Sequence, residues 1–192
     1  MHLQSSEAIA EQTLIERAKE DPRAFGDLFD RSYPPIFAYI LRRVGKWNDA
    51  QDIASEVFLK ALKGLWRFRW QGIAFSAWLY RIATNEIATY FRRAGRAPLS
   101  LTQLVEESGF EPASTHDLIA EKLEAERQLE RYRDFLIARS NIATLPMKYQ
   151  HVIALRFFER KSVKEIAEIL GKKEGTVKSL LSRGLERLRK LM

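Results

Sequence analysis

The chain has 192 residues, and 46% of them are hydrophobic, which is enough to bury one mid-sized core or two small ones. Its 32 lysines and arginines outnumber 25 acidic residues, and the resulting charge of +7 favours a polyanionic partner, either nucleic acid or an anionic membrane surface. The chain has no cysteine, which excludes disulfide scaffolds, thiolate metal sites and cysteine nucleophiles.

The sequence also lacks the marks of a secreted, membrane-spanning or catalytic protein. Its first twenty residues carry acids throughout and contain no apolar core of signal-peptide length. No run approaches the roughly 18 apolar residues that a membrane span needs. The absence of cysteine fits a reducing cytoplasm, and we expect a cytoplasmic location. The histidines lie far apart in the chain and no phosphate-binding glycine loop occurs, so we expect no catalytic residues, no metal and no cofactor.

Apolar residues recur at helical spacing, and the alternation typical of strands is nearly absent. The sequence therefore predicts an all-α fold with six or seven helices, arranged as two small helical domains joined by a flexible linker. The N-terminal domain is expected over residues 1–95, with helices near 6–19, 23–32, 36–44, 48–65 and 76–93.

Three local signals set boundaries inside this domain. Pro34 and Pro35 are expected to interrupt a helix, since proline removes a backbone hydrogen bond. Asn48 is a good N-cap with a glutamine three residues on. The helix that it starts carries an apolar stripe of Ile53, Val57, Phe58, Ala61, Leu62 and Leu65. Residues 66–75 are expected to form a loop.

Residues 96–140 are expected to form the linker between the domains. Prolines at 98 and 112 and a glycine at 109 predict irregular chain over 96–114. A charged helix is predicted over 115–140. The C-terminal domain is then expected over 141–192.

The C-terminal domain contains two short helices around a glycine. Ser162 and Glu165 form a capping box, so a helix begins there, and Gly171 stands where a helix ends in a left-handed conformation. A second helix follows Lys173, with an apolar side of Val177, Leu180, Leu181, Leu185, Leu188 and Leu191. This arrangement matches a helix-turn-helix.

The second of these helices is basic on its outer side. Residues 172–192 hold seven lysines or arginines and two glutamates, which supplies attraction for phosphates. The helix would lie in the major groove, with its N-terminal residues on base edges. The predicted DNA contacts are Lys172, Lys173, Thr176, Lys178, Ser179, Ser182 and Arg183. The plainer alternative is a solvated amphipathic helix at the edge of a bundle.

A second basic segment, residues 63–96, has seven lysines or arginines, one acid and three of the four tryptophans. Basic residues interleaved with aromatic rings suit single-stranded DNA, because cations hold the backbone and rings stack on bases. The alternative for Trp66, Phe68 and Trp78 is packing in the core, whereas Trp70 and Gln71 are expected to be exposed loop residues. His151 is expected to be a satisfied or surface histidine.

Two separated blocks resemble the extracytoplasmic-function sigma factors, the smallest bacterial sigma factors. Residues 145–190, with the run EGTVKSLLSRGLERLR, resemble region 4 of that family, which binds the −35 promoter element. NDAQDIASEVFLKAL at 48–62 and AFSAWLYRIATNEIATYFRR at 74–93 resemble region 2. Region 4 alone could also suggest the output domain of a response regulator, but no receiver domain is visible.

The resemblance implies a promoter-specificity subunit that binds core RNA polymerase, reads the −35 and −10 elements and helps melt DNA. Relatives hold an extruded base in the loop that corresponds to residues 66–75. The implied −10 contacts are Arg67, Trp70, Gln71, Arg81, Thr84, Asn85, Arg92 and Arg93. The implied contacts with core polymerase are Asp49, Asp52 and Glu56. Compensation of the helix dipole is an alternative for the first two of these acids.

The resemblance has departures, and it leaves other functions open. Lys173 stands where the family often has a serine that caps the recognition helix, Thr89 stands where an aspartate is frequent, and Leu180 and Leu185 stand where basic residues are common. An anti-sigma factor is a usual partner of the family. The alternative functions are a stand-alone helix-turn-helix regulator of duplex DNA and an RNA-binding adaptor.

Overall fold

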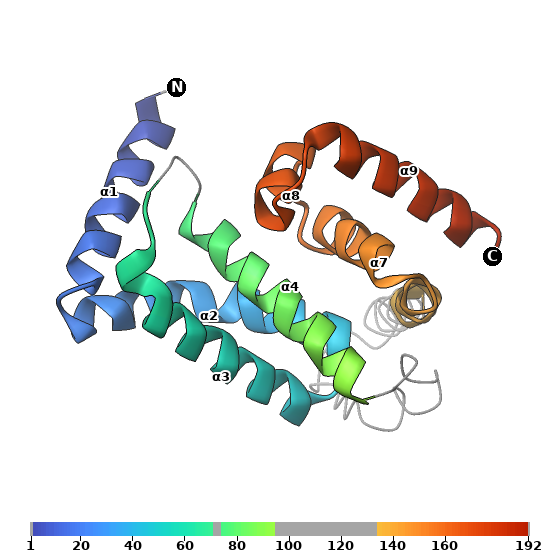
Figure 1. Cartoon of the computed structure of the whole chain (residues 1–192), viewed down its shortest axis with the longest axis horizontal. Helices are drawn as coiled ribbons and strands as arrows, with labels where there is room; N and C mark the ends of the chain where they lie inside the picture. Colours follow the sequence, from blue (N-terminus) through green and yellow to red (C-terminus); the bar gives the residue numbers. More distant parts are fainter. Residues whose placement is uncertain (1, 71–73, 95–133, 192) are drawn as a thin grey trace, which may run out of the picture.

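The computed structural model describes residues 2–70, 74–94 and 134–191, and all regular elements in these ranges are helical, as the sequence predicts (Figure 1). Residues 96–133 of the linker predicted over 96–140 lie outside the described residues, and residues 134–143 are helical. No helix in the described ranges is long and apolar enough to cross a membrane. The elements are α1 (His2–Ala18), α2 (Pro22–Val44), α3 (Trp47–Gly64), the 3₁₀ turn η1 (Leu65–Arg67), α4 (Phe75–Ala94), α7 (Met147–Ile153), the π-helical turn η2 (Ala154–Phe158), α8 (Val163–Leu170) and α9 (Glu174–Arg189).

Helices α1 to α4 form an N-terminal unit in which α2, α3 and α4 pack on one another. The apolar stripe predicted for α3 is buried at most of its positions, but Leu62 is 47% exposed. The fully buried side chains that join these helices are Ile15, Ile36, Tyr39, Ile40, Val57, Leu79 and Ile87. This core fixes the direction of α4, the helix that carries most of the predicted −10 contacts.

The predicted break at Pro34 and Pro35 is wrong, because α2 runs through both prolines. The two rings lie on the exposed face of the helix, and the carbonyls that lose their partners belong to Asp30 and Arg31, which are also exposed. Water can therefore satisfy these carbonyls. Buried residues on both sides of the prolines, such as Leu28 and Ile36, hold the two halves of the helix in one line against the core.

Helix α3 also begins earlier than predicted. Its N-cap is Lys46, which makes no side-chain capping bond, and Asn48 lies inside the first turn. Gly45 closes α2 with a left-handed φ of 87°, so only two residues separate the helices. The ring of Trp47, the first residue of α3, packs edge-on against Phe37 of α2, with 4.8 Å between the ring centroids.

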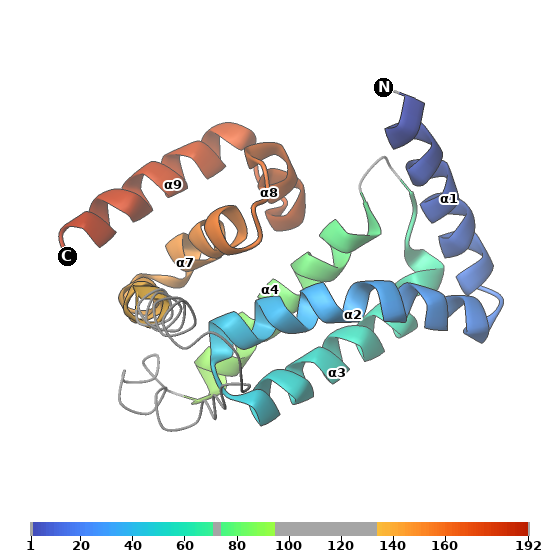
Figure 2. The same cartoon turned by 180° about the vertical axis from the view of Figure 1, so that it is seen from behind.

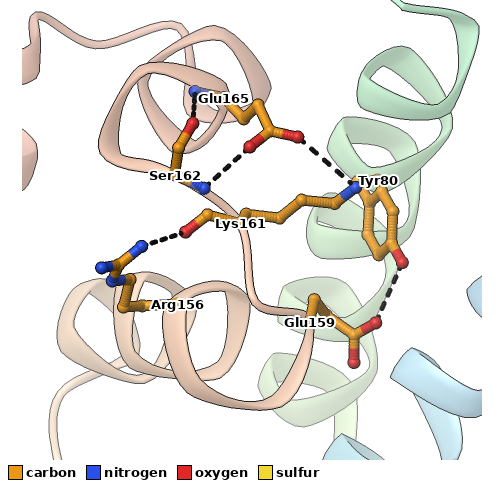
Figure 3. A network of polar contacts seen from close by, with 6 residues as sticks. All are labelled: Tyr80, Arg156, Glu159, Lys161, Ser162 and Glu165. Atoms are coloured by element: carbon orange, nitrogen blue, oxygen red, sulfur yellow. Dashed lines mark hydrogen bonds and ion pairs between the residues drawn. The ribbon is translucent and has the colours of Figure 1, made fainter.

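The C-terminal unit has the predicted helix-turn-helix. The Ser162 hydroxyl accepts from the Glu165 amide at 3.2 Å, and the Glu165 carboxylate accepts from the Ser162 amide at 2.8 Å (Figure 3). These bonds hold the pKa of Glu165 below its usual value despite partial burial. Gly171 ends α8 with a φ of 61°, and Lys173 begins α9 without a side-chain cap, both as predicted.

The apolar side of α9 differs from the predicted leucine stripe. Leu185 and Leu191 are 43% and 52% exposed, whereas Val177 and Gly184 are buried. A Cβ added at Gly184 would lie 2.9 Å from Cδ1 of Ile153 and 3.4 Å from Cβ of Tyr149. Gly184 therefore lets α9 approach α7 closely, a role that the helical period alone does not reveal.

Gly184→Val is expected to lower the free energy of unfolding by about 1–3 kcal/mol, because the branched side chain overpacks the contact between α7 and α9. Gly175→Val is the matched control, since a Cβ there meets no atom within 4 Å. Urea denaturation of both variants measures the difference. Equal stability of the two variants would contradict the role given to Gly184.

Candidate nucleic-acid interface

The predicted −35 contacts lie together on the outer face of the helix-turn-helix. All seven side chains are exposed, and α8 supports α9 from the opposite side. The uncapped N-terminus of α9 follows directly after the two lysines at 172 and 173, so free amides, the positive end of the helix dipole and two ammonium groups converge at one point. This surface can hold a phosphate while the next turns of α9 reach base edges.

Most of the predicted −10 set is also exposed, namely Arg67, Arg81, Asn85, Arg92 and Arg93. The guanidinium of Arg67 lies over the ring of Trp66, 4.3 Å from its centroid, and Trp66 is 65% exposed. An exposed tryptophan that is stacked under an arginine offers a flat surface for a base and a cation for its phosphate. Gln71 lies outside the described residues.

Two members of the −10 set are corrected by the structure. Thr84 is only 4% exposed, and its hydroxyl lies 3.1 Å from that of Tyr39, so it joins α4 to α2 and does not face a strand of DNA. Trp70 is partly buried against the core, although an exposed loop residue was expected. A large ring beside an apolar surface gains more by covering it than by facing water.

The remaining aromatic residues of this segment divide between core and surface. Phe68, Phe75 and Trp78 form a cluster with ring centroids 4.9 to 5.7 Å apart, so packing accounts for Phe68 and Trp78. Of the three rings for which core packing was the alternative, Trp66, Phe68 and Trp78, only Trp66 is exposed. Of the loop predicted over 66–75, residues 68–70 and 74 are irregular, residues 66 and 67 belong to η1, Phe75 begins α4, and 71–73 lie outside the described residues.

Arg81, another predicted −10 contact, is engaged by the C-terminal unit. Its Nε donates to the carbonyl of Ile169 at 2.9 Å, and its Nη2 donates to the carbonyl of Glu168. Both acceptors belong to the last turn of α8, where helix carbonyls lack partners within the helix. The sequence gives no signal of this contact, because the two partners are almost ninety residues apart.

The predicted acidic face of α3 lies next to α4, where the two helices pack against each other. Asp52 and Glu56 are exposed and line a hollow of about 400 Å³, together with Glu86 of α4. Lys60 bridges Glu86 at 2.8 Å and Glu56 at 3.2 Å, and the bond to Glu86 is the main cause of its raised pKa. Asp49 accepts from the Tyr90 hydroxyl at 2.6 Å, so its role is at least partly structural. Glu86 joins this face only through the packing of α3 on α4, so the spacing in α3 could not reveal it.

A buried cluster joins α2 to α7. Arg43 is 7% exposed and donates to Oε1 of Gln150 at 3.0 Å, while its Nη1 lies 3.4 Å from Nδ1 of His151. Burial, together with the charges of Arg43 and Lys172, lowers the pKa of His151 to about 3, so the ring is neutral at pH 7. His151 is thus a satisfied histidine, as predicted. Burial also lowers the pKa of Arg43.

A second polar cluster joins α4 and α2 to the segment after η2, and Figure 3 shows its contacts with Tyr80 of α4. The Tyr80 hydroxyl donates to Oε2 of Glu159 at 2.9 Å, and Nε of Arg42 lies 3.5 Å from Oε1 of the same carboxylate. The ammonium of Lys161 lies over the Tyr80 ring, 5.0 Å from its centroid. Burial and the nearby Glu159 carboxylate raise the pKa of Tyr80.

Comparison with known proteins places these features in a family. Residues 28–97 match the model of Sigma-70 region 2, and residues 137–188 match that of Sigma-70 region 4. The ECF RNA polymerase sigma-E factor of Haemophilus influenzae is 34% identical over 94% of this chain and 94% of its own length. ECF RNA polymerase sigma factor SigW of Bacillus subtilis is 33% identical, with 90% of each covered. The chain spans only 64% of ECF RNA polymerase sigma factor BldN of Streptomyces coelicolor, at 33% identity.

Solved structures show the same fold. CnrH, in complex with the cytosolic domain of CnrY, aligns with a TM-score of 0.64 and 22% identity over 95% of this chain and 96% of that chain. The sigma factor RpoE of Bartonella quintana, in complex with the anti-sigma factor NepR, aligns with a TM-score of 0.58 and 24% identity over 87% of this chain and 95% of that chain.

Proposed function

The chain belongs to the extracytoplasmic-function sigma factors of RNA polymerase, and on that premise we propose that it binds core polymerase, recognises −35 and −10 promoter elements and helps to melt the DNA. The observation that carries this proposal is the exposed polar and basic face of α9 on a well-capped helix-turn-helix, in one chain with a region 2 unit. We assign residues 1–95 to region 2, 96–140 to the linker and 141–192 to region 4.

In this proposal α9 reads the −35 element as duplex. Lys172, Lys173 and the amides at the start of α9 hold phosphates. The exposed side chains of the following turns reach the base edges, and they are Thr176, Lys178, Ser179, Ser182 and Arg183. Arg183 is the best placed of them for a bidentate contact with guanine, since its fork of donors matches the acceptors on that base.

The −10 strand is then assigned to the exposed part of region 2. Trp66 and Arg67 supply a ring and a cation, while Asn85 and Arg92 are exposed on α4. Arg93 is also exposed, and it lines the hollow beside Asp52 and Glu56. Arg81 belongs to this set only when it is released from α8. Thr84 is left out because it is buried.

The acidic face of Asp52, Glu56 and Glu86 is assigned to core polymerase. The three carboxylates outnumber the one cation, Arg93, that lines the same hollow, and this favours a basic partner surface. We also propose that the chain acts in the cytoplasm, that it has no catalytic activity of its own, and that an anti-sigma factor regulates it, as NepR is paired with RpoE of Bartonella quintana.

A stand-alone regulator of duplex DNA remains the alternative, and binding to separated strands tests it. The proposal predicts that purified chain bound to core polymerase prefers the single non-template strand of the −10 element over the same sequence as duplex. A chain that ignores core polymerase and binds a duplex operator tightly by itself would favour the alternative. An RNA-binding adaptor would show no preference for duplex DNA through α9.

Arg183→Ala is expected to weaken binding of −35 duplex about tenfold or more, because a bidentate contact with a base contributes about 1–3 kcal/mol. Arg189→Ala, at an exposed site near the C-terminus of the same helix, is the matched control and should change affinity much less. Fluorescence anisotropy with labelled duplex measures both. Equal losses in the two variants would mean that α9 binds through overall charge only.

A further inference from the structure

The turn between η2 and α8 has a backbone conformation that its sequence does not favour. Arg160 adopts a φ of 53°, and in the described ranges it is the one residue other than glycine with a positive φ. The amide of Lys161 donates to the carbonyl of Leu155, six positions earlier, at 2.9 Å. The end of α8 is closed in a similar way, but there the left-handed residue is Gly171. Glycine is the usual residue in such a turn, because a Cβ is strained in the left-handed region.

The side chains beside Arg160 hold the turn without its help. The guanidinium of Arg156 donates to the carbonyl of Lys161 at 3.0 Å (Figure 3). The ammonium of Lys161 lies 3.7 Å from the Glu165 carboxylate and also over the Tyr80 ring. Arg160 is exposed, and within the part of the chain that the structure describes its side chain makes no hydrogen bond or ion pair. No contact in the described structure therefore offsets the strain at this residue.

The place of Arg160 in the fold indicates what its guanidinium meets. Arg160 precedes Ser162, the N-cap of α8, by two residues. Both views of the fold show α8 between α4 and the start of α9 (Figure 1, Figure 2). When the second helix of a helix-turn-helix lies in the major groove, the first helix crosses the DNA backbone. The turn that leads into α8 is therefore expected to lie beside phosphates.

The other donors of this turn are already engaged. The capping box occupies the amides of Ser162 and Glu165. Arg156 and Lys161 are held by the contacts with their neighbours. In the described turn Arg160 is thus the cation left to meet an outside partner, and its fork of donors fits a phosphate. Strained residues without a role in the fold are typical of binding sites.

We propose that Arg160 is a backbone anchor, whose guanidinium binds a phosphate of the duplex that α9 reads, and that its left-handed conformation is kept for this contact. The inference rests on the proposed function and adds a residue outside the seven predicted −35 contacts. A phosphate contact carries no sequence information. Arg160 therefore contributes affinity for any duplex, whereas Arg183 contributes the preference for one sequence.

Replacing Arg160 by glycine tests the anchor, because the change relieves the strain and removes the charge together. The probes are a fluorescent duplex selected with the wild-type chain from a random library and an unrelated duplex of equal length. For the whole chain with Arg160→Gly we expect a urea midpoint at or above that of wild type, since glycine adopts the left-handed region without strain. Binding of both duplexes should weaken by the same factor, about threefold or more.

The salt dependence of binding gives a readout that a purely structural role would not change. Each phosphate contact contributes about 0.9 to the slope of log affinity against log salt concentration, so Arg160→Gly should make this slope shallower by about that amount. Arg160→Lys keeps the charge and should keep the slope. The matched control is Arg31→Gln, which removes an exposed cation of α2 and changes the net charge equally. It should leave the affinity and the slope close to those of wild type.

Three outcomes would overturn the anchor and leave the proposed function standing. They are wild-type affinity and slope in Arg160→Gly, an equal loss in Arg31→Gln, and a lower urea midpoint in Arg160→Gly, which would assign the residue to the fold. A different result bears on the proposed function itself. If the wild-type chain selects no duplex from the library and adds no promoter-specific transcript to core polymerase, the proposed function fails and the anchor falls with it.

Discussion

The double reversal Asp52→Lys, Glu56→Lys is expected to weaken binding of core polymerase by about 100-fold or more, because placing like charges against a basic partner costs several kcal/mol. Both side chains are exposed at the rim of the hollow between α3 and α4, so the substitutions should leave the fold intact. Surface plasmon resonance with immobilised core polymerase measures the affinity.

The matched control is Asp27→Lys, Asp30→Lys, a pair of exposed acids one turn apart on α2. It changes the net charge by the same amount but leaves the acidic face intact. Binding of −35 duplex should be retained by both variants, because α9 belongs to the other unit. Wild-type affinity in the first variant, or an equal loss in the control, would refute the assignment of this face.

Acidification from pH 7.5 to pH 5 is expected to lower the free energy of unfolding by up to about 2 kcal/mol through His151 alone. The pKa of His151 is about 3 in the folded chain, against 6.5 for a free histidine. Since the unfolded chain binds the proton and the folded chain does not, stability is complete above pH 6.5 and is lost as the pH falls from there toward 3. The charges that face this ring are Arg43 and Lys172.

The control for this prediction is His151→Gln, which keeps a polar acceptor near Arg43 but cannot titrate. Urea denaturation at both pH values gives the loss in each chain, and the difference between the losses isolates His151 from carboxylates such as Glu165. An identical loss in wild type and variant would show that His151 does not carry the effect.

The helix-turn-helix could be predicted almost completely from the sequence, because its signals are local. The capping box at Ser162 and the left-handed turn at Gly171 each depend on residues a few positions apart. Position 173 likewise shows no side-chain cap, since lysine has no acceptor to offer. The exposed face of α9 follows from the helical period once those ends are fixed.

Features that depend on packing between distant segments could not be predicted. The continuity of α2 through Pro34 and Pro35 requires the core beneath that helix, and the burial of Thr84 requires the hydroxyl of Tyr39. The role of Gly184 depends on Ile153 of another helix. In each case the sequence shows the side chain but not the neighbour that decides its environment.

The contacts between the two units also depend on packing between distant segments. The basic character of Arg81 suggested DNA, yet in the free chain its partners are main-chain carbonyls of α8. Main-chain acceptors leave no trace in composition or periodicity.

Run-off transcription with purified core polymerase on a pool of promoter fragments tests whether this chain is a promoter-specificity subunit. We expect that adding the chain yields new transcripts from fragments that share a −35 and a −10 element, and that Arg183→Ala reduces them. Transcripts from core polymerase that are unchanged by the chain across the whole pool would contradict its role as a promoter-specificity subunit.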